Sequence, residues 1–185
     1  MDRKEFLRNT CGLGLCACTG MLLAGKAGAK EKAAECPPPK DEWKLDFVQN
    51  RFSKFVDVID QQVDPDTRDQ MFGKFGEVCS NESVGQFKQY IGNIDGFLQY
   101  IRENWVESAE FDKARNEITI TGKPSDKCFC PFVGNSKMST NFCNCSTGWM
   151  KQTYGAILGK KVEAKATATV LRGDDRCSFK IQILG

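Results

Sequence analysis

The C-terminal segment constrains the fold more than any other part of this chain, because apolar and polar residues alternate along it with the period of a β-strand. The even positions of residues 162–170 and the odd positions of residues 177–183 are apolar, and the turn sequence RGDD separates the two runs. This pattern predicts an antiparallel hairpin with one face on a core and the other in solvent. Three alanines on the buried face, Ala164, Ala166 and Ala168, leave space for either a closely packed helix or a ligand cavity.

Three upstream segments carry apolar residues at helical spacing, over residues 43–63, from Pro65 onward, and over residues 87–105. Asp64 is a good N-cap for the second helix, which Pro65 can begin. The third helix contains Gly92 and Gly96, where we expect a close approach by another backbone or a kink. The expected core-facing residues of the first two helices are Val48, Phe52, Phe55, Val56, Ile59, Val63, Met71, Phe72, Phe75, Val78 and Cys79.

In residues 108–124 the apolar residues recur every second residue instead of every 3.6 residues. This predicts a hairpin with Ile118 and Ile120 on one face and DKARN as its turn. A short helix should follow, capped by Ser146 or Thr147 and ended by Gly159 in the left-handed conformation. The expected fold class is α+β: amphipathic helices packed on a small antiparallel sheet, with a C-terminal β-hairpin.

The N-terminus has the three parts of an export signal: a basic start, an apolar stretch over residues 11–24, and Ala27 and Ala29 placed for cleavage. The sequence DRKEFLR resembles the twin-arginine signal pattern, with Lys4 in place of the second arginine. We expect cleavage and export to the periplasm or cell envelope. The alternatives are lipidation of Cys18 or an uncleaved membrane anchor, although the apolar stretch is short for a span.

The expected domain organisation is therefore a signal over residues 1–29, a proline-containing linker over residues 30–42, and a single domain over residues 43–185. The chain has 26 basic and 24 acidic residues with no basic cluster among aromatic ones, so nothing supports nucleic-acid binding. It also has no histidine, the usual general base, and no glycine-rich phosphate loop. These features favour a binding protein over an enzyme.

Two Cys-x-Cys pairs, Cys128/Cys130 and Cys143/Cys145, are the main candidates for a functional site. In extended backbone the two side chains of such a pair point the same way, so they can chelate one ion but are poorly placed to bond to each other. Four thiolates are the ligands of a closed zinc site or an iron–sulfur cluster. We expect a metal site at these four residues. Cys145 should lie near a helix N-terminus, where the helix dipole lowers a thiol pKa.

Disulfides are the main alternative, because an exported protein can form them, and redox catalysis by the thiols is a third reading. Cys79 and Cys177 are possible additional ligands or buried apolar residues. The cysteine count does not decide among these readings. Cleavage after Ala29 leaves seven cysteines, at positions 36, 79, 128, 130, 143, 145 and 177.

Residues 128–183 resemble the C-terminal half of 4-vinyl-reductase-like domains, in which a cysteine-bearing loop, a helix and a hairpin ending in Gly-x-x-x-Cys-x-Phe recur. Gly173, Cys177 and Phe179 match that ending, and Cys79 matches a position in an earlier helix. The resemblance implies helices against an antiparallel sheet, binding of a small apolar molecule, and metal-binding cysteines. We expect the ligand between the alanine face and the aromatic helices, at Ala164, Ala166, Ala168, Phe179, Phe97 and Trp149.

Overall fold

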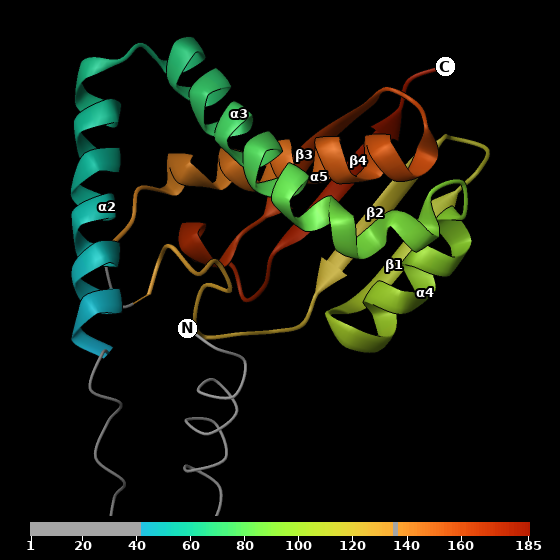
Figure 1. Cartoon of the computed structure of the whole chain (residues 1–185), viewed down its shortest axis with the longest axis horizontal. Coiled ribbons are helices and arrows are strands. Elements are labelled where there is room, and N and C mark those ends of the chain that lie inside the picture. The colour runs from blue at the N-terminus through green and yellow to red at the C-terminus, as the bar shows by residue number, and fades with distance from the viewer. Residues whose placement is uncertain (1–41, 135–136) are drawn as a thin grey trace, which may run out of the picture. The chain divides into compact units, whose positions relative to one another are not determined.

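The structure, a computed structural model, describes residues 42–134 and 137–185 (Figure 1). The predicted signal over residues 1–29 and the linker up to residue 41 lie outside the described residues. The helices are α2 (Glu42–Gln62), α3 (Pro65–Val84), α4 (Ile94–Asn104) and α5 (Asn144–Leu158), with short 3-10 helices η1 (Gly85–Tyr90), η2 (Thr140–Cys143) and η3 (Val170–Arg172). The strands are β1 (Val106–Asp112), β2 (Glu117–Gly122), β3 (Val162–Ala168) and β4 (Ser178–Ile183).

The four strands form one antiparallel sheet in the order β1-β2-β4-β3. Both predicted hairpins are confirmed, and Asn116 at φ 50° and Gly173 at φ 96° lie in their connections. Pairing of β2 with β4 sets Ile118 opposite Ile181 and Ile120 opposite Phe179. These four apolar side chains are buried, so one face of the sheet carries the core.

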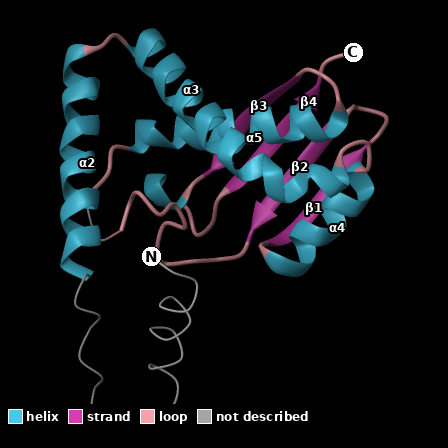
Figure 2. Ribbon diagram, viewed as in Figure 1, coloured by secondary structure: helices cyan, strands magenta, loops and turns pink. Residues whose placement is uncertain are grey.

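Helices cover this apolar face, as Figure 2 shows. Helix α5 packs on β3 and β4, α4 packs on β1, and α3 packs on α5. Phe97 of α4 and Tyr154 of α5 are each 1% exposed, and their ring centroids lie 5.4 Å apart over the sheet. The predicted α+β fold class is therefore confirmed.

The predicted third helix is not continuous, which corrects the sequence analysis. The chain forms η1, turns at Gly92 in the left-handed region (φ 77°), and starts α4 behind Asn93. The Asn93 side chain accepts a hydrogen bond from the N–H of Gly96 at 3.0 Å and so caps α4. The N–H of Gly92 donates to the carbonyl of Ile157 at the end of α5, at 2.8 Å. Gly92 thus marks both a break and a close approach of two backbones.

Two of the predicted apolar stripes are only partly buried. On α2, Val56 and Ile59 are buried, whereas Val48 and Phe55 are more than half exposed. On α3, Phe72 is buried, but Met71 and Val78 are among the exposed apolar residues. For α2, the reason is that the helix packs through a face that includes polar residues. The Gln49 amide donates to the carbonyl of Pro131, and the Ser53 hydroxyl donates to the carbonyl of Lys137.

Two of the three predicted helix caps are confirmed. Asp64 caps α3 by accepting from the N–H of Thr67 at 3.0 Å, and Gly159 ends α5 at φ 62°. The predicted cap of α5 at Ser146 or Thr147 is wrong, because η2 runs directly into α5 and the helix begins at Asn144. Within the described residues, no helix combines the length and apolarity needed to cross a membrane.

Candidate functional site

A second hydrophobic cluster lies beside the sheet core, where α2, α3 and the start of α5 meet the segment between β2 and η2. Five phenylalanines dominate it, and we call them the phenylalanine cluster: Phe52, Phe72, Phe75, Phe132 and Phe142. The ring of Phe52 lies 5.0 Å from that of Phe132 and 5.3 Å from that of Phe142. Contacts of this kind between aromatic rings add to the stabilisation from burial.

The described residues contain six cysteines that lie in this cluster or interact with thiols near it, and all six are free. They come from four separate parts of the chain: α3, the segment after β2, the η2–α5 junction and the position just before β4. Three of them, Cys128, Cys130 and Cys145, pack with the phenylalanine cluster, while Cys177 packs against the sheet core. We call the whole set the thiol cluster: Cys79, Cys128, Cys130, Cys143, Cys145 and Cys177.

The pKa values of the two most perturbed thiols show that members of the thiol cluster interact. The pKa of Cys130 is raised to about 11. Burial is the main cause, the N–H of Phe132 opposes it, and the thiols of Cys128, Cys143 and Cys79 add to it. The pKa of Cys145 is raised to about 12, mainly by burial and also by the thiols of Cys79, Cys130 and Cys143. Because like charges repel, these thiols disfavour one another's ionisation.

Burial is also the main cause of the raised pKa values of Cys128 and Cys143. Burial raises the pKa of Cys128, which the thiols of Cys177 and Cys143 raise further against an opposing contribution from the N–H of Cys130. Burial also raises the pKa of Cys143. A hydroxyl partner and Arg172 oppose that effect: the sulfur of Cys143 lies 3.4 Å from Oγ1 of Thr169, and this hydroxyl favours the thiolate. The thiols of Cys128, Cys130, Cys143 and Cys145 are therefore protonated at neutral pH.

The location of Cys145 agrees with the sequence analysis, but its predicted ionisation does not. Cys145 is the second residue of α5, at the helix N-terminus. Its pKa is nevertheless raised, mainly by burial and further by the neighbouring thiols. A buried thiol with a raised pKa is a poor nucleophile. The arrangement thus gives little support to redox catalysis by free thiols.

A close crossing of α3 and α5 positions Cys79 of α3 and Cys145 of α5. A Cβ atom on Gly76 would lie 1.8 Å from the carbonyl oxygen of Cys145, and one on Gly148 would lie 1.9 Å from that of Gly73. Only glycine allows the two backbones to come so close. Farther along the same crossing, the buried hydroxyls of Ser80 and Thr153 are hydrogen-bonded at 2.7 Å. Periodicity in the sequence gives no sign of this crossing.

Cys177 is placed by the sheet. The N–H of Gly122, at the end of β2, donates to the carbonyl of Cys177 at 2.8 Å. The following segment stays near this region, because the N–H of Ser125 donates to the carbonyl of Asp175 at 2.9 Å and the Cys177 thiol contributes to the raised pKa of Cys128. In the part of the chain that the structure describes, no three Cys, Asp or Glu side chains are arranged as they stand to hold a metal ion. The backbone brings the sulfur donors into one region without setting their side chains around a common point.

The residues of the predicted ligand pocket lie together at the interface of α5, α4 and the sheet. Phe97, Phe179 and Ala166 are buried in the sheet core, and Ala164 and Trp149 pack against it partly buried. Ala168 ends β3, opposite Ser178, and is also half-buried. Helix α5 packs against β3, so side chains such as Tyr154 and Ile157 lie within this region.

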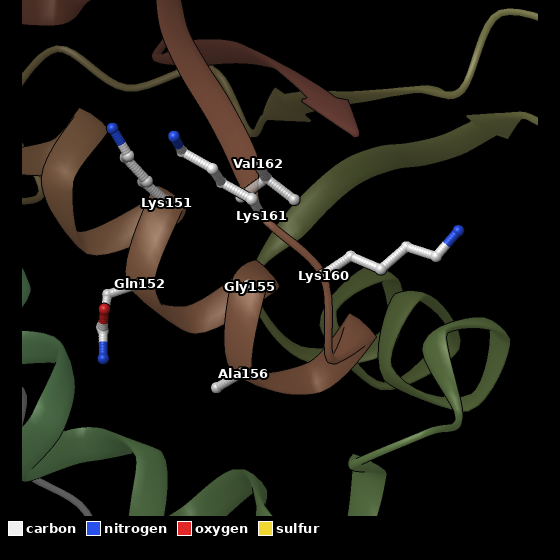
Figure 3. Close-up of a pocket in the computed structure, with 7 residues that line it drawn as sticks. All are labelled: Lys151, Gln152, Gly155, Ala156, Lys160, Lys161 and Val162. Atoms are coloured by element: carbon white, nitrogen blue, oxygen red, sulfur yellow. The ribbon is translucent and has the colours of Figure 1, made fainter. Parts of the chain in front are cut away.

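An open surface pocket of about 340 Å³ lies at the other end of the same α5–β3 layer (Figure 3). Its lining is Lys151, Gln152, Gly155, Ala156, Lys160, Lys161 and Val162. The side chains of Lys151 and Lys161 extend to the same side, while that of Lys160 extends away from them. Lys151 is paired with Glu163 at 3.0 Å. This lining differs from the predicted pocket and is more polar than an apolar ligand requires.

Comparison with known proteins supports the fold only. No family model matches the sequence, and no curated protein matches it either. Among solved structures, the chain is similar to a trafficking protein particle complex subunit 3 from Naegleria fowleri, covalently bound to palmitic acid. The TM-score is 0.50 at 11% identity, over 78% of this chain and 97% of that one.

Two further solved structures are similar at lower scores. One is the phenol-responsive sensory domain of the transcription activator PoxR, with a TM-score of 0.46, 10% identity, and 73% and 74% of the two chains covered. The other is a vinyl-4-reductase family protein from Methanocaldococcus jannaschii, with a TM-score of 0.33, 13% identity, and 82% and 85% covered. The first comparison shows that the fold resembles that of the trafficking subunit.

Proposed function

We propose that this protein is a non-catalytic binding domain that holds a metal through its two Cys-x-Cys pairs and takes up a small apolar molecule. The metal is a zinc ion or an iron–sulfur cluster, and the proposed ligands are Cys128, Cys130, Cys143 and Cys145. The observation that carries the proposal is the convergence of free thiols from four parts of the chain on one region beside the phenylalanine cluster.

Thiol chemistry explains why a metal suits this region. A buried group of protonated thiols contributes little as a nucleophile, but a soft or borderline metal ion displaces their protons and is bound by the thiolates. Zinc and iron–sulfur centres both prefer four such ligands. Because the side chains do not yet surround a common point, metal binding would draw the segment carrying Cys128 and Cys130 toward the start of α5. Uptake of the metal should therefore release protons and stabilise the fold.

The apolar ligand is proposed on different grounds. The similar trafficking subunit is covalently bound to palmitic acid, and the similar sensory domain binds phenol. The proposed location is the predicted pocket at Ala164, Ala166, Ala168, Phe179, Phe97 and Trp149. Since Phe97 and Phe179 are buried there, a ligand would enter only if α5 or these rings moved. We also propose that the chain is a divergent 4-vinyl-reductase-like domain that is exported to the periplasm or cell envelope.

Elemental analysis combined with thiol counting tests the metal site. The protein is the chain from Lys30 to Gly185, purified without oxygen; both hydrophobic clusters draw on residues between Phe52 and Ile183, so this chain contains them. The Cys143→Ser/Cys145→Ser variant removes two proposed ligands. The Cys79→Ser/Cys177→Ser variant is the matched control, because it removes the same number of thiols from the same cluster.

We expect about one zinc, or iron with visible absorbance, per chain. The Cys143→Ser/Cys145→Ser variant should lose the metal and the control should retain it. Iron with reversible bleaching on reduction would assign the site to electron transfer. Metal-free protein with few free thiols, and peptides cross-linked between residues 128–130 and 143–145, would refute the proposal in favour of a disulfide-stapled protein.

Native mass spectrometry tests the apolar ligand separately. We expect bound apolar material or uptake of fatty acids, and weaker uptake when Ala166→Phe fills the proposed pocket. An Ala114→Phe change in the exposed β1–β2 turn is the matched control. Bare protein that takes up neither fatty acids nor hydrophobic dyes would contradict this half of the proposal and leave the metal half standing.

A further inference from the structure

Helix α2 carries more than half of the exposed large apolar side chains of the described residues. Eleven such side chains are exposed among the described residues, and the six on α2 are between 51% and 63% exposed. The six are Trp43, Leu45, Phe47, Val48, Phe55 and Val58. Such a concentration on one helix is unusual for a soluble monomer and marks an interaction surface.

Five of the six lie on one side of the helix. At about 100° per residue, all except Leu45 fall within an arc of about 140°. The opposite side is where α2 packs, through Gln49, Ser53, Val56 and Ile59. In Figure 1, α2 is the blue-green helix at the edge of the molecule, so its outer side is not covered by the other described elements. We call this side the outer face of α2.

The charges on the outer face are basic. Lys44, Arg51 and Lys54 fall within the same arc, and the Arg51 guanidinium lies 5.2 Å from the ring centroid of Phe47. The acidic residues Asp46 and Asp57 fall between the arc and the packed side, and Asp60 falls on the packed side, where it accepts a hydrogen bond from Asn141. Lys54 is paired with Asp57 at 3.3 Å across that boundary, but both groups are exposed and the pair is weak.

We propose that the outer face of α2 lies on an anionic lipid surface. Aromatic and aliphatic side chains interleaved with Lys and Arg are the pattern of helices that lie in the plane of a membrane interface. The apolar side chains would enter the boundary between headgroups and acyl chains, while Arg51 and Lys54 reach the lipid phosphates. The helix would lie along the membrane, in keeping with the lack of a spanning helix among the described residues.

Charge complementarity favours lipid over a second copy of this chain. The exposed residues run from Trp43 to Val58, so their midpoint is near Arg51. In a two-fold antiparallel pair of α2 helices, Arg51 would therefore face its own copy, and no carboxylate of the outer face is there to neutralise it. An anionic membrane removes this repulsion, since each basic residue near its surface strengthens binding about fivefold.

Co-sedimentation with lipid vesicles tests this assignment, using the chain from Lys30 to Gly185 so that the apolar stretch over residues 11–24 is absent. Vesicles of phosphatidylcholine alone are compared with vesicles containing about 30% phosphatidylglycerol. We expect binding to the anionic vesicles that weakens with added salt. Trp43→Ser/Phe47→Ser should weaken it about tenfold or more, and Arg51→Gln/Lys54→Gln about 30-fold.

Matched variants remove similar groups elsewhere. Met71→Ser/Val78→Ser takes two exposed apolar side chains from α3, and Lys88→Gln/Lys123→Gln takes two exposed charges. Both should bind vesicles like the parent chain. Equal binding to the two vesicle types, no binding to either, or no loss in the α2 variants would overturn the proposal. So would sedimentation velocity showing a dimer that Trp43→Ser/Phe47→Ser dissociates, which would assign the outer face to a second copy.

Discussion

Replacing Gly76 with alanine tests whether the α3–α5 crossing positions the thiol cluster. The added methyl group would lie 1.8 Å from the carbonyl oxygen of Cys145 and 2.8 Å from the nitrogen of Trp149. Both atoms belong to the backbone of α5, so no side-chain rotation can relieve the contact. The two helices must separate at this point, and the start of α5 must move with them.

Two opposing effects set the size of the change in stability. Alanine is favoured over glycine within a helix by about 1 kcal/mol. Overpacking a buried contact costs about 1–3 kcal/mol, or more where backbone must shift. Because a contact at 1.8 Å is far inside van der Waals distance, the second effect should dominate, and we expect Gly76→Ala to lower the free energy of unfolding by about 2 kcal/mol.

Gly73, one turn earlier on the same helix, supplies the matched control. A Cβ atom there has no heavy atom within 4 Å, so Gly73→Ala keeps only the propensity gain of up to about 1 kcal/mol. Urea unfolding of both variants, analysed at a common m-value, measures the difference. A Gly76→Ala protein as stable as the Gly73→Ala protein would show that the helices do not cross as closely as described.

The remaining predictions concern buried polar groups. Thr153→Val should lower the free energy of unfolding by about 1–3 kcal/mol, because it leaves the Ser80 hydroxyl buried without its partner. Adding Ser80→Ala should recover most of that loss. If urea unfolding shows that the double variant loses as much free energy as the two single variants together, the pairing of the two hydroxyls is contradicted. The second prediction concerns pH. The reduced, metal-free protein should lose stability above about pH 9, since folding raises the pKa of Cys130 to about 11 and that of Cys145 to about 12. A group with a raised pKa stabilises the fold fully below its unfolded value and ceases to do so as the pH passes its folded value. Urea midpoints between pH 8 and 11 should therefore fall less steeply in a Cys130→Ala/Cys145→Ala variant, and equal slopes would refute the assignment.

The sheet could be predicted because its signal is local. Alternation at Ile118 and Ile120, and again at Phe179 and Ile181, places these residues on one face whatever packs against them. The break at Gly92 was harder to predict, because both η1 and α4 bury their apolar residues in the same core. Helical spacing therefore continues across the break. The local signs were Gly92 itself and Asn93 as an N-cap, three residues before Gly96.

Packing of α2 could not be read from its apolar residues. Periodicity assigns Phe55 and Val56 to one stripe, yet only Val56 is buried. Hydrogen bonds from Gln49 and Ser53 to carbonyls in the segment after β2 orient the helix, and such long-range polar contacts leave no periodic signal. The resulting rotation exposes apolar residues that sequence reasoning placed in the core.

The cysteines show most clearly what spacing can and cannot predict. The extended backbone expected for a Cys-x-Cys pair is wrong for the second pair, because Cys143 ends η2 and Cys145 lies in α5. Spacing also could not show that Cys79 comes near Cys145, or that Cys177 comes near Cys128, because these approaches depend on tertiary packing. The ionisation of Cys145 was predicted from its position at a helix N-terminus, whereas its pKa follows burial and neighbouring thiols that only the tertiary structure brings close.

The crossing of α3 and α5 ties the candidate site to the stability of the fold. Gly76 and Cys79 lie one turn apart on α3, and the carbonyl of Cys145 lies against Gly76. Any separation of the helices would therefore move Cys79 away from Cys145 and shift the second Cys-x-Cys pair relative to the first. If the pairs bind one metal, Gly76→Ala should weaken metal retention as well as stability, because binding energy must then offset the displacement. Gly73→Ala should retain the metal. Comparing metal retention in the two variants therefore tests whether the metal site depends on the close α3–α5 crossing.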